Sequence, residues 1–134
     1  MSNSSHGVTV ETVSGVTIFK VHGALKLGEP ALDELRGRCC ELASHAVDRL
    51  VLDLEQVSYI DSSGIGVLMH AYTSMHNRGG QCKLLNLGPT PAEVLRVVHL
   101  LGLFEVYHDC NAALASFERP NQPTQVAGGP ERAA

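Results

Sequence analysis

The chain has 134 residues, of which 44% are hydrophobic and 18% are charged, and this balance is typical of one folded domain with a buried core. Its formal net charge of −4, with no run of Lys or Arg and no Trp, argues against direct nucleic-acid binding. No apolar stretch reaches the length of a membrane span, and residues 1–6 lack the pattern of a secretory signal. We therefore expect a cytoplasmic protein without membrane insertion.

The first part of the chain predicts a β-hairpin followed by a helix. Residues 8–13 and 16–22 alternate apolar and polar side chains, which is typical of paired strands. From Pro30 onwards apolar residues recur at intervals of three and four, which predicts an amphipathic helix over residues 29–44. The short polar stretch 1–7 before the hairpin is expected to be disordered.

Apolar runs predict three further strands. Residues 49–54 are almost all apolar, as in a central strand that is covered on both sides. Residues 81–87 form a second run, which Gly88 and Pro89 end, and residues 104–107 form a short third run. Helical patterns separate these runs, so we expect the three strands to be parallel.

Two of the connecting helices have clear end signals. One is predicted to begin near Ser62 and to end near Arg78, because Gly79 can take the left-handed conformation that follows a last turn. Thr90 and Glu93 have the spacing of a capping box, which predicts Thr90 as the N-cap of the next helix.

The end of the chain predicts one more helix and a tail. Gly102 is expected to stop the preceding helix, and Asp109 is expected to cap a last helix that runs to Phe117. Residues 118–134 are rich in Pro, Gly and Gln, which predicts a disordered tail. The order of the elements predicts a single α/β domain over residues 8–117, with about four helices and a mixed, mostly parallel sheet of four to five strands.

The candidate functional residues follow the predicted strand at residues 49–54. Asp61, Ser62 and Ser63 are all good N-cap residues, yet one helix needs only one cap. The remaining hydroxyls then lie at the positive end of the helix dipole, where a phosphate would be stabilised. Gly64 and Gly66 remove bulk from the same turn, so another surface can come close to the backbone. A purely structural capped helix is the alternative interpretation.

The chain lacks the motifs of the common enzyme classes. Ser62 is not part of a G-x-S-x-G elbow, the seven histidines are scattered, and His70 and His76 lack the spacing of a zinc helix. No Lys follows a glycine-rich turn as in a P-loop. The four cysteines form no C-x-x-C pair, which predicts reduced and mostly buried thiols. We expect no catalytic residue, metal or cofactor.

These patterns together resemble the anti-sigma factor antagonist family, which is built on the STAS domain. The resemblance covers residues 8–117 and centres on an Asp-Ser-Ser-Gly core. It rests on Asp53, Leu54, Val57, Tyr59, Ile60, Asp61, Ser62, Ser63, Gly64, Ile65, Gly66, Val67, Leu68, Gly79, Gly80, the strand at 84–87, Val94, Leu95, Leu101, Gly102, Leu103 and Phe104.

The resemblance implies a non-enzymatic switch protein of transcription regulation. In that family the first serine after the aspartate, here Ser62, is phosphorylated by a partner that is both an anti-sigma factor and a GHKL-type serine kinase, with Ser63 as the second choice. The unphosphorylated form binds this partner and frees a sigma factor, and a serine phosphatase reverses the modification. ATP and Mg²⁺ belong to the partners. The implied partner-binding residues are Asp61, Ser62, Ser63, Gly64, Ile65 and Lys26.

One departure from the family pattern concerns the loop after the second strand. Family members often have Gly-Glu-Leu-Asp there, whereas this chain has Gly23, Ala24, Leu25 and Lys26, so one positive charge replaces two negative charges. The usual kinase partner would therefore meet a changed surface. This difference motivates a second interpretation, a constitutive STAS scaffold subunit of a lipid-transport or stress-signalling complex. A small nucleotide- or anion-binding domain is the third.

Overall fold

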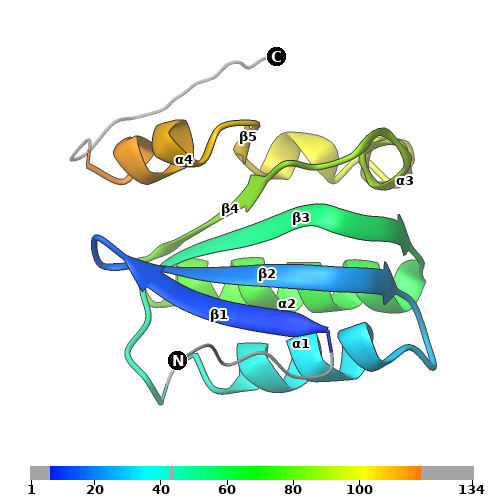
Figure 1. The fold of residues 1–134 in the computed structure, drawn as a ribbon, viewed down its shortest axis with the longest axis horizontal. Coiled ribbons are helices and arrows are strands. Elements are labelled where there is room, and N and C mark those ends of the chain that lie inside the picture. Colours follow the sequence, from blue (N-terminus) through cyan, green and yellow to red (C-terminus); the bar gives the residue numbers. More distant parts are fainter. Residues whose placement is uncertain (1–6, 43, 119–134) are drawn as a thin grey trace.

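A five-stranded sheet forms the centre of the computed structural model, which describes residues 7–42 and 44–118. The elements in chain order are β1 (Val8–Val13), β2 (Val16–Leu25), α1 (Pro30–Cys40), β3 (Arg49–Ile60), α2 (Ser62–Asn77), β4 (Gln81–Leu85), α3 (Pro89–Val97), the 3₁₀ helix η1 (Leu101–Leu103), β5 (Val106–Tyr107) and α4 (Cys110–Ser116). The strands lie in sequence order, with β1 antiparallel to β2 and the others parallel (Figure 1). The predicted α/β fold with a mixed, mostly parallel sheet is confirmed.

The core lies on both faces of the sheet, because successive residues of a strand point to opposite sides. In β3, Leu50, Leu52 and Leu54 belong to the larger apolar cluster, which includes the buried faces of α1 and α2. Val51 belongs to a smaller cluster with Phe117, which directly follows α4. In Figure 1, α1 lies below the strands in the view, α2 lies behind β2, and α4 lies above the strands. Burial on both faces explains the nearly continuous apolar run of β3.

The two central strands are longer than the sequence pattern predicts. The apolar run ends at Leu54, but β3 continues to Ile60, and β2 continues past His22 to Leu25. The two extensions pair with each other through shifts in register, and Leu25 lies opposite Ile60. The predicted end of β3 is wrong because pairing with β2 continues through exposed polar residues such as Gln56, which interrupt the apolar run.

Helix α1 is shorter than predicted. The apolar spacing continues to Leu42, yet the last helical residue is Cys40. Leu42 stays buried in the following turn, where its N–H donates to the Cys39 carbonyl at 3.3 Å. Ala46 then takes φ +55°, a left-handed conformation that an α-helix of L-residues excludes. The predicted range 29–44 is wrong because the apolar spacing continues to Leu42, beyond the last helical residue Cys40.

Helix α3 begins before the predicted capping box. Gly88 is the N-cap and Pro89 is the first helical residue, so Thr90 does not cap the helix. Glu93 pairs with Arg96 instead of reaching back to the helix start. Proline suits the first helical position because it has no N–H that would be left unpaired. The prediction of Thr90 as the N-cap is therefore wrong.

The end of α3 and the two following boundaries also differ from the prediction. The helix ends at Val97, and His99 takes φ +65°, so Gly102 does not stop it. Strand β4 ends at Leu85, and β5 starts only after Phe104, whose side chain is buried in the larger cluster. Leu87 and Phe104 therefore contribute to the core without being part of a strand.

Two predicted helix ends are confirmed. Gly79 takes φ +77° immediately after Arg78, the C-cap of α2, as expected of the residue that follows a last turn. Asp109 is the N-cap of α4, and its Oδ2 accepts a hydrogen bond from the Ala112 N–H at 3.1 Å.

The predicted disordered ends fall almost entirely outside the described residues. Of the segments 1–7 and 118–134, the structure describes only Gly7 and Glu118. The Gly7 carbonyl accepts a hydrogen bond from the His22 N–H at 2.7 Å, which extends the pairing of β1 and β2. The extent of disorder at both ends stays a prediction. Within the described part of the chain, we find no helix that combines the length and apolarity needed to cross a bilayer.

Candidate functional site

The Asp-Ser-Ser-Gly stretch lies where the chain passes from β3 into α2. Figure 1 shows this junction at the same end of the sheet as the connection from β2 to α1. This is the carboxyl edge of the parallel strands, where open α/β sheets carry their functional loops. Of the three possible caps, Asp61 is the N-cap, and Ser62 is the first residue of α2. The prediction that the serines lie at a helix start is confirmed.

The residues of the first turn of α2 differ in exposure. Ser62 is exposed, whereas Ser63 and Ile65 are half-buried. Ile65 packs against the larger apolar cluster, so only part of its side chain is accessible. Gly66 is exposed, and an added Cβ there would meet no atom within 4 Å. Ser62 is therefore the more accessible of the two hydroxyls.

Gly64 is buried, and its own chain fills the space that a side chain would occupy. A Cβ at this position would lie 2.3 Å from the Leu25 carbonyl oxygen and 2.9 Å from Cγ2 of Ile60. The missing side chain thus allows α2 to approach β2 of the same domain. The expectation that Gly64 gives room to a second molecule is replaced by a role in internal packing.

The Asp61 carboxylate connects the start of α2 to the loop after β2. Its Oδ1 accepts from the Gly64 N–H at 3.0 Å, and its Oδ2 accepts from the Leu27 N–H at 3.0 Å. The Asp61 N–H in turn donates to the Leu25 carbonyl at 3.1 Å. The hydrogen bonds from Leu27 and Gly64 lower the pKa of the Asp61 carboxyl from its ordinary value, because they stabilise the charged form.

The loop between β2 and α1 brings two further residues to this edge. Lys26, which stands where family members often have an acidic residue, is exposed there. Leu27 is 75% exposed, the largest fraction among the exposed large hydrophobic residues of the described chain. Sequence patterns did not single out Leu27, although an apolar residue between Lys26 and Gly28 in a predicted loop was the available signal.

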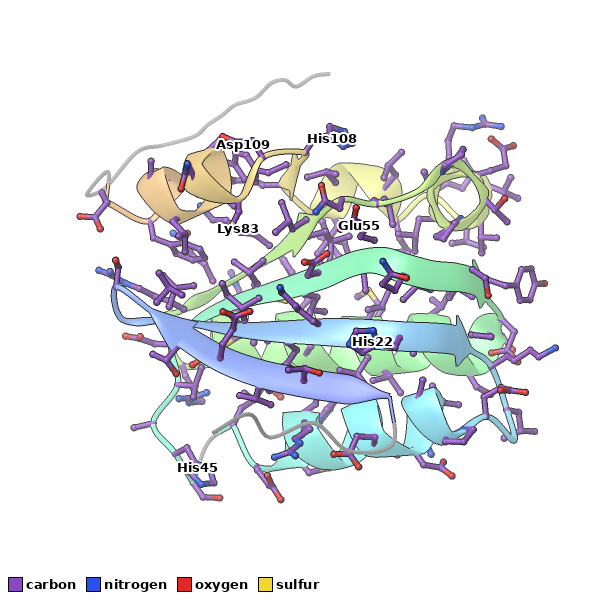
Figure 2. The ribbon with its side chains drawn as sticks, viewed as in Figure 1. His22, His45, Glu55, Lys83, His108 and Asp109 are labelled. Carbon is purple, nitrogen blue, oxygen red and sulfur yellow. The ribbon has the colours of Figure 1, made fainter. Side chains whose placement is uncertain are left out.

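The three histidines labelled in Figure 2 lie on separate parts of the fold. Figure 2 shows His22 on β2, His45 in the connection before β3, and His108 next to Asp109, the N-cap of α4. The Nδ1 atom of His45 lies 2.9 Å from the Glu41 carbonyl oxygen. Over residues 7–42 and 44–118, no group of three or more His, Cys, Asp or Glu side chains is placed to hold a metal ion.

The four cysteines are free, as predicted, but they are not mostly buried. Cys39 and Cys82 are buried, whereas Cys40 and Cys110 are exposed. Burial raises the pKa of the Cys39 thiol to about 12, because it disfavours the thiolate, and raises the pKa of Cys82 for the same reason. Neighbouring residues of α1 point to different sides, which separates the environments of Cys39 and Cys40.

A buried lysine in β4 has no counterpart in the sequence-based predictions. Lys83 is 4% exposed, and its Nζ donates to the Ser116 hydroxyl at 2.7 Å and lies 3.1 Å from the Glu105 carboxylate. The same ammonium group lies 4.3 Å from the centroid of the Phe117 ring. Figure 2 shows Lys83 between β4 and α4. These contacts attach α4 to the sheet, which is a structural role.

Comparison with known proteins identifies the family. The STAS domain model matches residues 7–113. The chain is 27% identical over 100 residues to the anti-sigma F factor antagonist of Paenibacillus polymyxa, which covers 74% of this chain and 81% of that protein. It is 33% identical over 72 residues to the anti-sigma-B factor antagonist of Bacillus subtilis, which covers 54% and 62%.

The fold is also similar to that of a solved relative. The structure of the Bacillus cell fate determinant SpoIIAA in its phosphorylated form matches with a TM-score of 0.66 at 22% identity, covering 82% of this chain and 98% of that one. The distant homologues are thus named anti-sigma factor antagonists, and the chain belongs to the STAS domain family.

Proposed function

We propose that the chain is an anti-sigma factor antagonist that is controlled by phosphorylation at Ser62. In its unphosphorylated form it binds an anti-sigma factor that is also a GHKL-type serine kinase, and this binding frees a sigma factor. Phosphate on Ser62 ends the binding, and a serine phosphatase restores it. The chain itself is a binding protein and a substrate, so ATP and Mg²⁺ belong to the kinase. The names of the homologues support the anti-sigma factor as partner.

The observation that carries the proposal is the exposed Ser62 hydroxyl at a helix start that another residue caps. Because Asp61 accepts from the Gly64 N–H, the Ser62 side chain is not needed as the cap. An exposed hydroxyl can enter the active site of a kinase without unfolding the domain. Ser63 is half-buried, which makes it the poorer substrate of the two.

The free domain can carry a phosphate at this position. Phosphorylation adds about −1.5 to −2 charges at neutral pH. The positive end of the α2 dipole favours such a charge, by about 0.3–1 kcal/mol for an ordinary acidic side chain in the first turn. Ser62 is exposed, so the phosphate remains hydrated in the free chain. We expect the modified domain to keep its fold.

The same phosphate opposes binding when a partner covers it. An interface would strip water from the phosphate, and desolvation of a charge is costly unless the partner supplies matching groups. The Asp61 carboxylate, which is adjacent to Ser62 in sequence, already adds negative charge at the same edge. A partner surface that complements the unmodified chain would therefore meet a more negative electrostatic potential after phosphorylation. Partner binding therefore fails while the fold persists.

The test is a reconstituted partner switch. A preformed complex of the kinase partner and its sigma factor is mixed with the wild-type chain, and free sigma factor is measured by size-exclusion chromatography. We expect wild type to release sigma factor without nucleotide and to lose this effect with Mg-ATP. Ser62→Ala should release it in both conditions, and Ser63→Ala should behave as wild type.

The phosphomimetic variant separates the switch from a permanent scaffold. Ser62→Asp is expected to keep the circular dichroism spectrum of the wild type and to release no sigma factor. Full binding by Ser62→Asp would contradict the switch and would favour the constitutive STAS scaffold, whose contacts do not depend on the charge at this residue.

A further inference from the structure

The most exposed large apolar side chain of the described residues lies beside the proposed phosphorylation site. Leu27 is 75% exposed, compared with 60% for Val97, 44% for Tyr59 and 42% for Val98. Single exposed apolar residues are common on protein surfaces and need a second observation before they indicate a partner. Here the second observation is the way in which the backbone of Leu27 is held.

Leu27 occupies the corner of a closed turn. The Glu29 N–H donates to the Lys26 carbonyl at 3.0 Å, and Gly28 takes φ +91°. A four-residue turn with glycine at its third position in a left-handed conformation places the second residue at the corner. Leu25, immediately before the turn, is fully buried in the core and anchors it. The side chain of Leu27 is thus presented to solvent by a defined backbone.

The turn is also fixed relative to Ser62. The Asp61 Oδ2 accepts from the Leu27 N–H at 3.0 Å, while Oδ1 of the same carboxylate caps α2 through the Gly64 N–H. Asp61 directly precedes Ser62, so its side chain links the backbone of Leu27 to the residue next to the proposed phosphorylation site. An anchor that is held in place before binding loses less entropy when it is buried by a partner.

We propose that Leu27 is an apolar anchor that inserts into a pocket of the kinase partner, and that Asp61 is the positioning residue that holds Leu27 in place. This inference rests on the proposed function, because the occupant of the surface is the protein that phosphorylates Ser62. The turn is joined to the residue before Ser62 by the hydrogen bond from the Leu27 N–H to Asp61, so it lies on the surface that a kinase bound at Ser62 approaches. Asp61 thus contributes to docking through Leu27.

The first test measures phosphorylation kinetics of Leu27→Ala with the serine-kinase anti-sigma factor from the partner-switching experiment. Loss of a buried leucine anchor predicts an increase in KM of about 10- to 50-fold, with kcat unchanged, because the hydroxyl itself is unaltered. Val97→Ala is the matched control, since it truncates an exposed apolar residue at the far end of α3, and its KM should equal that of wild type. An unchanged KM for Leu27→Ala would overturn the proposal.

The second test separates the positioning role of Asp61 from its capping role. Asparagine is as good an N-cap as aspartate, but its side chain has one oxygen and so can replace only one of the two acceptors. We expect Asp61→Asn to keep the helical signal, to speed amide hydrogen exchange at Leu27 in the free chain, and to raise KM. In the Leu27→Ala background, Asp61→Asn should raise KM less than twofold further.

The outcomes distinguish this inference from the proposed function. If Asp61→Asn raised KM by the same factor in the Leu27→Ala background as in the wild-type chain, the positioning role of Asp61 would be overturned. Failure of the kinase to phosphorylate wild type would overturn the proposed function, and it would be seen before any variant is made. Sedimentation of wild type as a dimer that Leu27→Ala dissociates would overturn the inference by assigning this surface to a second copy of the chain.

Discussion

Replacement of Gly64 by alanine is expected to destabilise the domain, although the same change stabilises most helices. The added Cβ would lie 2.3 Å from the Leu25 carbonyl oxygen, 2.9 Å from Leu25 Cβ and 2.9 Å from Ile60 Cγ2. The nearest of these atoms belongs to the backbone of β2, which is paired with β3 at this position and cannot rotate away. The first turn of α2 must therefore move away from the sheet.

Two opposing contributions set the size of the effect. Alanine gains about 1 kcal/mol over glycine from helix propensity. Overpacking of a tight core site costs about 1–3 kcal/mol, and a clash with backbone belongs in the upper part of that range. We therefore expect Gly64→Ala to lower the free energy of unfolding by about 1–2 kcal/mol.

Gly66→Ala is the matched control in the same helix. An added Cβ at Gly66 would meet no atom within 4 Å, so only the helix propensity changes, and we expect a gain of about 0.5–1 kcal/mol. Urea denaturation followed by far-UV circular dichroism measures both variants, whose free energies of unfolding should differ by about 1.5–3 kcal/mol. Equal stabilisation by the two substitutions would refute the close packing of α2 on β2.

Two further predictions concern titratable groups. The pKa of Asp61 is lowered in the folded state, so its contribution to stability is present above the ordinary carboxyl value near pH 4 and is lost as pH falls through the lower folded value. The free energy of unfolding of wild type should therefore exceed that of Asp61→Asn at neutral pH and approach it in stronger acid, as urea titrations across pH would show; a constant difference would contradict the hydrogen bonds of Asp61. For the thiols, a chromogenic disulfide reagent at pH 8 should modify Cys40 and Cys110 rapidly, and Cys39 and Cys82 only when the domain unfolds, because burial raises the pKa of the latter pair. Four equally fast thiols would contradict the described core.

The sequence was most informative where local chemistry and the global fold agree. Asp109 and Gly79 mark helix ends by short-range effects that the tertiary structure leaves intact. Ser62 was predicted at a helix start for the same reason, since three cap residues precede an apolar stripe. The sequence pattern did not reveal long-range strand pairing, because the extension of β3 to Ile60 depends on pairing with β2, which is distant in sequence.

The candidate site shows the same limit. Spacing alone indicated that Asp61 could cap α2, but its second hydrogen bond joins it to Leu27, and no local pattern predicts a contact between these two segments. Likewise, glycine at position 64 indicated a close approach, and only the fold shows that the approaching group is Leu25 of the same chain. Sequence located the candidate stretch, and the tertiary structure distinguishes the capping residue Asp61 from the closely packed Gly64 and the exposed Ser62.

The measurement that tests the central claim most directly is the intact mass of the chain after incubation with its kinase partner and Mg-ATP, followed by fragmentation to locate the modified residue. We predict one added phosphate on wild type and on Ser63→Ala, located at Ser62, and none on Ser62→Ala. Phosphate on Ser62→Ala to the same extent as on wild type, or an unmodified wild-type chain, would contradict the account.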